Sequence, residues 1–292
     1  MAPDQMVRDA ATVTKLKDAS EFYRRGRLPE AETVCRAILT TEPDHFEARR
    51  LLGVVLYWKT DFEGAERELR HALNIDPTSA DLHVDRAVTL RSLARFEEAL
   101  ESAETAVALR PDSTQTLYRR GVALMDLRRS DEAMASFDAV LALDPNHAEA
   151  VNDRGITLGQ LNRFDEAIAH HDRALAINPS YAHAFNNRGV ALCAVGRFEE
   201  ALTSYAKVLA LEPSCAEAHY NRGIALTAMK DAKDRRASSD ADSVRQNMKL
   251  LEDALACFDA ALALRADFPE AQEKRARCKA ALVRNDGASP HF

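Results

Sequence analysis

The sequence predicts an all-α solenoid of stacked helical hairpins, and three regular spacings lead to this prediction. Prolines recur at a constant step, at Pro43, Pro77, Pro111, Pro145, Pro179 and Pro213. Small residues follow the same step, at Gly53, Ala87, Gly121, Gly155, Gly189 and Gly223. Alanines and aromatics share the register, at Ala65, Ala99, Ala133, Ala167 and Ala201 and at Phe62, Phe96, Phe164 and Phe198. A period of about 34 is typical of a helix–turn–helix unit that stacks on its neighbours.

Each class of repeated residue has a structural reason to recur. A small residue permits close backbone approach where two helices cross, and a large residue beside the alanine fills the remaining gap. A proline follows the second helix because it cannot continue that helix. One hairpin cannot bury its own apolar face, so stability must come from stacking neighbours into a continuous core.

The register divides the chain into an extension over 1–11 and seven repeats, at 12–45, 46–79, 80–113, 114–147, 148–181, 182–215 and 216–268. The seventh repeat is longer, because its ALACFDAALALRA segment begins at Ala254, beyond the regular step from the matching Ala201 of the sixth. The extra residues fall near 231–249. We expect a solvated loop or lengthened helices there. The alternative is an arm that folds over a binding surface or carries a regulatory site, since Arg235-Arg236-Ala237-Ser238 resembles a basophilic kinase site.

The carboxyl-terminal residues are expected to close the stack. Residues 269–284 read as a capping helix with a charged outer face, which a terminal repeat needs in water. The segment 285–292 is expected to be a flexible tail.

Composition narrows the class of protein. The chain is 46% apolar but 6% aromatic, and no run approaches the ~20 apolar residues that span a membrane. The start lacks the apolar core of a signal peptide. Five cysteines without paired spacing predict free thiols and a reducing cytoplasm. The formal net charge of −7 opposes nucleic-acid binding. Since no catalytic motif, metal-ligand spacing or phosphate loop is found, we expect no enzyme activity, metal or cofactor.

The segments VNDRGITLGQLNRFDEAIAHHDRALAINP and FNNRGVALCAVGRFEEALTSYAKVLALEP resemble the tetratricopeptide repeat family. They are most similar to bacterial repeats attached to SPINDLY-type O-linked N-acetylglucosamine transferases. The resemblance implies a right-handed superhelical solenoid of seven tetratricopeptide repeats with a capping helix. Two departures stand out: Ser130 replaces the aromatic of the fourth repeat, and Thr60, Ala94 and Arg128 stand where the family often has a turn glycine.

The residue after each small residue points away from the core side of the first helix, yet it is always β-branched and apolar, where an ordinary amphipathic helix would be polar. In the family that side lines the concave surface. The resulting candidates for a peptide-binding groove are Val54, Tyr57, Val88, Tyr118, Val122, Asn152, Ile156, Asn186, Asn187, Val190, Tyr220, Asn221 and Ile224. Continuous apolar surface usually marks an interaction site. The alternative is that these side chains merely pack between adjacent first helices.

Two further columns of residues recur at the repeat spacing, and only the first bears on peptide binding. Asn187 and Asn221 resemble two rungs of the asparagine ladder in glycosyltransferase-linked repeats, where amides bind a peptide backbone. The earlier rungs are Leu51, Asp85, Arg119 and Asp153, so at best half a ladder is present. A second column holds Arg86, Arg120, Arg154, Arg188 and Arg222, continued by Arg275. We interpret it as a structural column between repeats, tied to nearby acids, rather than as a site for an acidic partner.

The sequence therefore predicts a non-enzymatic protein-interaction scaffold that holds a peptide or helix of a partner protein in its groove. One alternative is the substrate-recognition module of a glycosyltransferase whose catalytic domain lies elsewhere. Another is self-assembly into a homo-oligomer. A chaperone-type clamp on a terminal carboxylate is not expected, because its asparagine would fall where the valines and isoleucines from Val54 to Ile224 stand.

Overall fold

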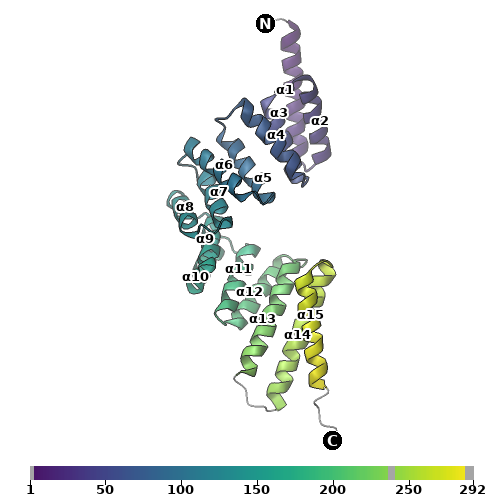
Figure 1. Cartoon of the computed structure of the whole chain (residues 1–292). Coiled ribbons are helices and arrows are strands. Elements are labelled where there is room, and N and C mark those ends of the chain that lie inside the picture. The colour runs from purple at the N-terminus through teal and green to yellow at the C-terminus, as the bar shows by residue number, and fades with distance from the viewer. Residues whose placement is uncertain (1–2, 236–240, 287–292) are drawn as a thin grey trace. The chain divides into compact units, whose positions relative to one another are not determined.

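The computed structural model describes residues 3–235 and 241–286, in which fifteen helices and no strand are found (Figure 1). The helices form seven pairs and a final helix. The pairs are α1 (Pro3–Arg24) and α2 (Leu28–Thr41), α3 (Phe46–Trp58) and α4 (Phe62–Ile75), α5 (Ala80–Ser92) and α6 (Phe96–Leu109), α7 (Thr114–Asp126) and α8 (Ser130–Leu143), α9 (Ala148–Gln160) and α10 (Phe164–Ile177), α11 (Ala182–Ala194) and α12 (Phe198–Leu211), and α13 (Ala216–Asp234) and α14 (Ala241–Leu264). The last helix is α15 (Pro269–Asp286). The all-helical repeat fold predicted from the spacing is confirmed.

The inserted residues of the seventh pair lengthen its helices wherever the structure describes them. Helix α13 has 19 residues and α14 has 24, against 13 and 14 in the pair before. The kinase-like motif ends at Ser238, which lies outside the described residues. In the added turns, Lys230 Nζ lies 2.6 Å from Asp234 Oδ2, and Asn247 donates a hydrogen bond to the same aspartate. The insertion is therefore, in its described part, a continuation of the hairpin.

The chain comprises two units, Met1–Pro145 and Asn146–Phe292, and each has its own core. Within a unit, the glycine that recurs in the first helices faces a core side chain of the second helix. A Cβ added to Gly121 would lie 2.6 Å from Phe137 Cε1, and one on Gly189 would lie 2.6 Å from Tyr205. These contacts explain glycine at the two positions, because a Cβ there would overlap a buried ring.

The turn inside each hairpin contains one residue in the left-handed region, again once per repeat over the first six hairpins. These turn residues are Gly26, Thr60, Ala94, Arg128, Asn162 and Gly196, with φ between 56° and 79°. Only two are glycine, the residue that this conformation favours. The non-glycine residues noted in the sequence therefore keep the turn geometry at some cost in strain.

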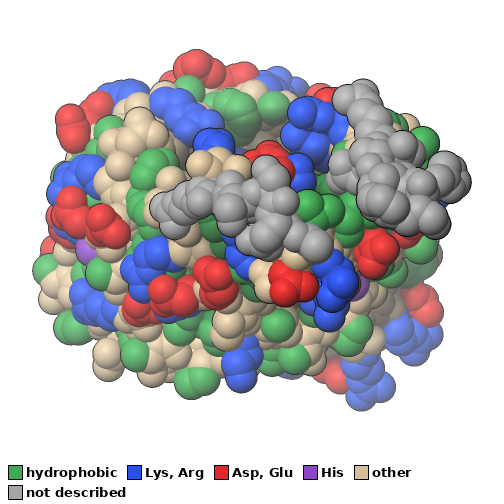
Figure 2. All heavy atoms as spheres, turned by 90° about the horizontal axis from the view of Figure 1, so that it is seen from below, with side chains coloured by type: hydrophobic (Ala, Val, Ile, Leu, Met, Phe, Trp, Pro, Cys, Tyr) green, Lys and Arg blue, Asp and Glu red, His purple; other side chains and the backbone are tan. Residues whose placement is uncertain are grey.

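Most second helices are preceded by an arginine and carry a glutamate three residues after it. The four pairs from Arg95–Glu98 to Arg197–Glu200 have Nε–Oε1 distances of 2.7 Å, and their arginines lower the pKa of each glutamate. On the face shown in Figure 2, basic and acidic side chains lie next to one another. None of the described helices combines the length and the apolar character that a membrane-spanning segment requires.

Candidate binding groove

Three adjoining pockets lie on the first helices of the first unit. The largest is about 440 Å³ and is lined from α1, α3 and α5. It shares Tyr23, Val54 and Asp85 with a pocket of about 180 Å³ that reaches α7. A third, of about 40 Å³, continues between α5 and α7 and shares Tyr57, Val88 and Arg119 with the second. Because each pocket shares its walls with the next, they form one surface across α1, α3, α5 and α7, which we call the groove.

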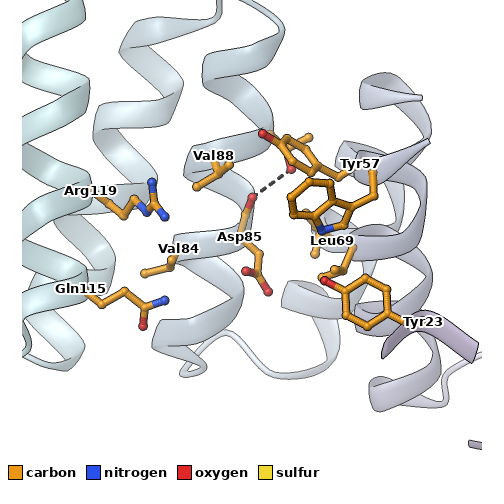
Figure 3. A pocket seen from close by; sticks show the side chains of 11 residues that line it. Tyr23, Tyr57, Leu69, Val84, Asp85, Val88, Gln115 and Arg119 are labelled. Atoms are coloured by element: carbon orange, nitrogen blue, oxygen red, sulfur yellow. Dashed lines mark hydrogen bonds between the residues drawn. The ribbon is translucent and has the colours of Figure 1, made fainter. Parts of the chain in front are cut away.

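The walls of the groove are rich in aromatic and aliphatic side chains (Figure 3). Tyr57 contacts Trp58 edge to face, with ring centroids 5.8 Å apart, and also contacts Phe62. The Trp58 side chain is 60% exposed, which is unusual for so large an apolar group. The combination of exposed aromatic rings and a recessed apolar floor is typical of protein interaction sites.

Charged side chains lie among these apolar walls. Asp85 is in α5 and accepts a long hydrogen bond from Arg50 Nε, with a distance of 3.5 Å to Oδ2. Burial raises the pKa of the Asp85 carboxyl, and the guanidinium groups of Arg50 and Arg119 oppose this shift. At the α7 side, Arg91 is paired with Asp126. Arg119 points from α7 toward α5 (Figure 3). Its guanidinium lies over the Tyr118 ring, 5.4 Å from the ring centroid.

Several predicted residues of the first unit lie at the groove. Val54, Tyr57 and Val88 line the central pocket. Val122 lines the smallest pocket but is only 4% exposed. Its burial is consistent with the alternative that this side chain packs between adjacent helices. Tyr118 packs on Phe137, with centroids 6.1 Å apart, and supports Arg119 from beside the groove.

The predicted residues of the second unit form hydrogen bonds among themselves. Asn187 Nδ2 donates to Asn152 Oδ1 at 3.3 Å, and Asn221 Nδ2 donates to Asn186 Oδ1 at 3.0 Å. Each bond joins one first helix to the next, so the amide column stabilises the stack. The Asn187 and Asn221 amides thus use part of their hydrogen-bonding capacity inside the protein.

The apolar candidates of the second unit differ in exposure. Val190 is 49% exposed, whereas Ile156 and Ile224 are half-buried. Tyr220 packs on Phe268, just before α15, and on Phe258 of α14, with ring centroids 4.8 and 5.9 Å away. The predicted stripe is therefore open at Val190 and covered in part elsewhere.

A buried histidine lies behind this face. His171 is 2% exposed, and its Nδ1 lies 3.0 Å from Asn152 Oδ1. Burial, together with the charges of His170 and Arg188, lowers its pKa to about 4. His171 occupies the position that Phe137 and Tyr205 hold in the neighbouring repeats, so it acts as a neutral core side chain.

Sequence reasoning did not select the residues that complete the groove. Tyr23 could have been found, because it holds the position of Tyr57 one repeat earlier. Trp58 carried no such signal, because it follows a groove position on the last turn of α3. Asp85 and Arg119 were noted only as gaps in the asparagine ladder, although both line the central pocket.

The arginine column is structural in the described residues. Arg86 Nη1 donates to Ser102 Oγ at 2.9 Å, and Arg188 Nη1 donates to Ser204 Oγ at 2.9 Å. Arg188 also pairs with Asp172 of the preceding hairpin. The column therefore joins first and second helices. No group of three or more potential metal ligands is found in the part of the chain that the structure describes.

Solved structures resemble the fold. A tetratricopeptide repeat protein from Parabacteroides merdae matches with a TM-score of 0.73 and 18% identity, over 92% of this chain and 99% of the other. A chain of the APC/C hetero-tetramer Cut9–Hcn1 matches with a TM-score of 0.70 and 15% identity, over 89% of this chain and 48% of that one. TTC0263, a tetratricopeptide repeat protein of Thermus thermophilus, matches with a TM-score of 0.57 and 24% identity, over 62% and 98%. At these identities the likeness shows the fold alone.

No curated protein matches the sequence. Three family models do match it, each described as a tetratricopeptide or TPR repeat. They cover residues 22–89, 84–148, and 157–196 with 191–230. Together these matches extend over more than half of the chain. The chain therefore belongs to the tetratricopeptide repeat family.

Proposed function

We propose that this protein is a non-enzymatic scaffold that binds an extended or helical segment of a partner protein in the groove. Tetratricopeptide repeats generally mediate protein–protein interaction and are typically not catalytic. The observation that carries the proposal is the continuity of three pockets across four consecutive first helices, with aromatic rings on their walls. A surface of this length fits a peptide segment rather than a small molecule.

Affinity would come from apolar side chains of the partner that bury against Tyr23, Val54, Tyr57 and Val88. Aromatic anchors in desolvated pockets dominate such interfaces, and truncating one typically costs about 2 kcal/mol or more. Rigid first helices hold these side chains in place before binding, which reduces the ordering cost of association.

Trp58 offers a direct assay, because it is the single tryptophan of the chain and lies on the groove wall. Peptides selected from a displayed random library are titrated into the protein while Trp58 emission is followed. We expect a saturable blue shift, since a bound segment removes water from the indole ring. Val88→Asp should abolish the shift, and the isosteric Val88→Thr should weaken it.

The matched control is Val244→Asp, because Val244 is 51% exposed on α14, far from the groove in sequence. It should bind selected peptides as the unmodified protein does. Circular dichroism of every variant separates lost binding from lost folding. Peptides that bind without responding to either Val88 variant would contradict the groove as the binding site.

The glycosyltransferase hypothesis depends instead on Asn187 and Asn221 of the second unit. Each still has its Oδ1 and one N–H bond with which to hold a peptide backbone. Because each amide already donates one N–H to a neighbouring asparagine, it has fewer hydrogen bonds to offer a peptide. We therefore favour the groove of the first unit. Self-assembly would be recognised by concentration-dependent mass in solution. We propose a cytoplasmic setting, supported by five free cysteines, three of them buried.

A further inference from the structure

We propose that Arg119 binds a side-chain carboxylate of the partner segment, so that the segment carries an aspartate or glutamate beside its apolar anchors. This inference rests on the proposed function and specifies the chemistry of the same groove. On this proposal, Arg119 determines the binding preference for acidic over neutral partner segments.

The first argument is a comparison within one column of the repeat register. In this column Asp85 accepts a hydrogen bond from Arg50, and Asp153 accepts one from Asn152 at 3.0 Å. Asn187 and Asn221 donate to amides of the preceding first helix. Among the described residues of this polar column, Arg119 alone makes no hydrogen bond or ion pair within the protein.

The second argument is the burial of the Arg119 Nε atom. This donor is shielded from solvent and finds no acceptor among the described residues. The fold removes water from the donor without replacing the lost hydrogen bond, which is unfavourable. Stacking over Tyr118 stabilises the cation but satisfies none of its donors. A partner carboxylate would accept from two N–H groups on one edge of the guanidinium, once a small rotation of the Arg119 side chain turns that edge toward the groove.

The third argument is the distribution of charge along the groove. Of the described residues that line the central pocket, Asp85 is the only carboxylate, and Arg50 approaches it from α3. At the α7 side, Arg91 is matched by Asp126, and Arg119 adds a positive charge without a hydrogen-bonded acid among the described residues. A partner carboxylate is therefore favoured beside α7 and disfavoured beside Asp85, while the apolar wall between Tyr57 and Val88 accepts its neighbours.

The test uses peptides with both ends blocked, selected on the unmodified protein and titrated by Trp58 emission. We expect the selected sequences to share an aspartate or glutamate at one aligned position. Exchanging it for asparagine or glutamine should weaken binding about tenfold to hundredfold, the range for a hydrogen bond to a charged group. Arg119→Gln should weaken binding of the acidic peptide by the same factor and leave binding of the amide peptide unchanged. Arg119→Lys should retain part of the preference.

Arg67→Gln is the matched control, because Arg67 is exposed on α4 and the change removes the same charge from the same unit. It should alter binding less than twofold. Groove binders that lack an acidic position, or that bind Arg119→Gln as tightly, would overturn this inference and leave the proposed function standing. Peptides that bind only with a free terminal carboxylate would also overturn it. A library without any groove binder would overturn both.

Discussion

The contact between Gly121 and Phe137 allows one substitution to be predicted in both sign and size. Alanine at position 121 would place its Cβ 2.6 Å from Phe137 Cε1 and 2.9 Å from Cδ1. The ring is 0% exposed and cannot move toward solvent. Overpacking of this kind costs about 1–3 kcal/mol, whereas replacing a helical glycine with alanine gains up to about 1 kcal/mol. We expect Gly121→Ala to lower the free energy of unfolding by about 1–2 kcal/mol.

Two comparisons isolate the steric term. Gly159 lies in α9 with nothing within 4 Å of an added Cβ, so Gly159→Ala should stabilise by about 0.5–1 kcal/mol. In the third repeat, Ala87 stands at the position of Gly121 and Ala103 at that of Phe137, both buried, which indicates that a Cβ is accepted when the opposite side chain is small. Gly121→Ala should therefore become stabilising in a Phe137→Ala background, although Phe137→Ala itself costs about 3–5 kcal/mol.

Urea denaturation followed by far-ultraviolet circular dichroism measures these differences. The slope of each transition must be compared as well, because repeat proteins can unfold in parts. A Gly121→Ala protein as stable as the unmodified one would refute the steric reasoning. So would an unchanged effect of Gly121→Ala when Phe137 is alanine.

Three further predictions follow from the same structure. Ala94 has a φ of 56°, so Ala94→Gly should raise the free energy of unfolding by about 0.5–1 kcal/mol. Gly196 has a φ of 79°, so Gly196→Ala should lower the free energy of unfolding by about 1 kcal/mol. If both substitutions changed stability in the same direction, the strain argument would be wrong. Burial lowers the His171 pKa to about 4 from an ordinary 6.5, so stability should be full above pH 6.5 and fall by about 3 kcal/mol as the pH drops to 4. His171→Phe should remove that part of the acid sensitivity in pH-dependent urea titrations, and an unaltered pH profile would contradict it. Val122 is 4% exposed and Val190 is 49% exposed. In thermal melts, Val122→Asp should therefore destabilise the protein by about 3 kcal/mol or more, and Val190→Asp by less than about 0.5 kcal/mol. Similar losses of stability would show that exposure does not distinguish the two positions.

The fold was predictable because its signals are local and repeated. A proline after the second helix, a small residue at the crossing and a constant repeat length each act within one hairpin, and neighbouring hairpins reuse the same contacts. The left-handed turns at Thr60, Ala94 and Arg128 were marked only by a missing glycine. The form of the insertion was left open by the sequence, since both a loop and longer helices preserve the register on either side of it.

The candidate site was predictable in part. Helical geometry placed Val54, Tyr57 and Val88 on one side of their helices, and the structure brings these three to one pocket. The sequence did not indicate that Trp58 would be exposed on the groove wall, or that Asp85 and Arg119 would line the same pocket. Those facts depend on which side chains of the adjacent hairpins reach the space between two first helices.

The sequence by itself determined the repeat, its register and the face that each residue presents, because these follow from the chain's own periodicity. Tertiary structure decided which of those faces stay open. Val122 and Val190 hold equivalent positions, yet one is 4% exposed and the other 49%. Arg119 and Asn187 also hold equivalent positions, yet Asn187 donates to Asn152 while Arg119 Nε meets no acceptor in the described part of the chain. Exposure and pairing depend on the side chains that neighbouring repeats contribute, and the register of a single repeat does not specify those neighbours.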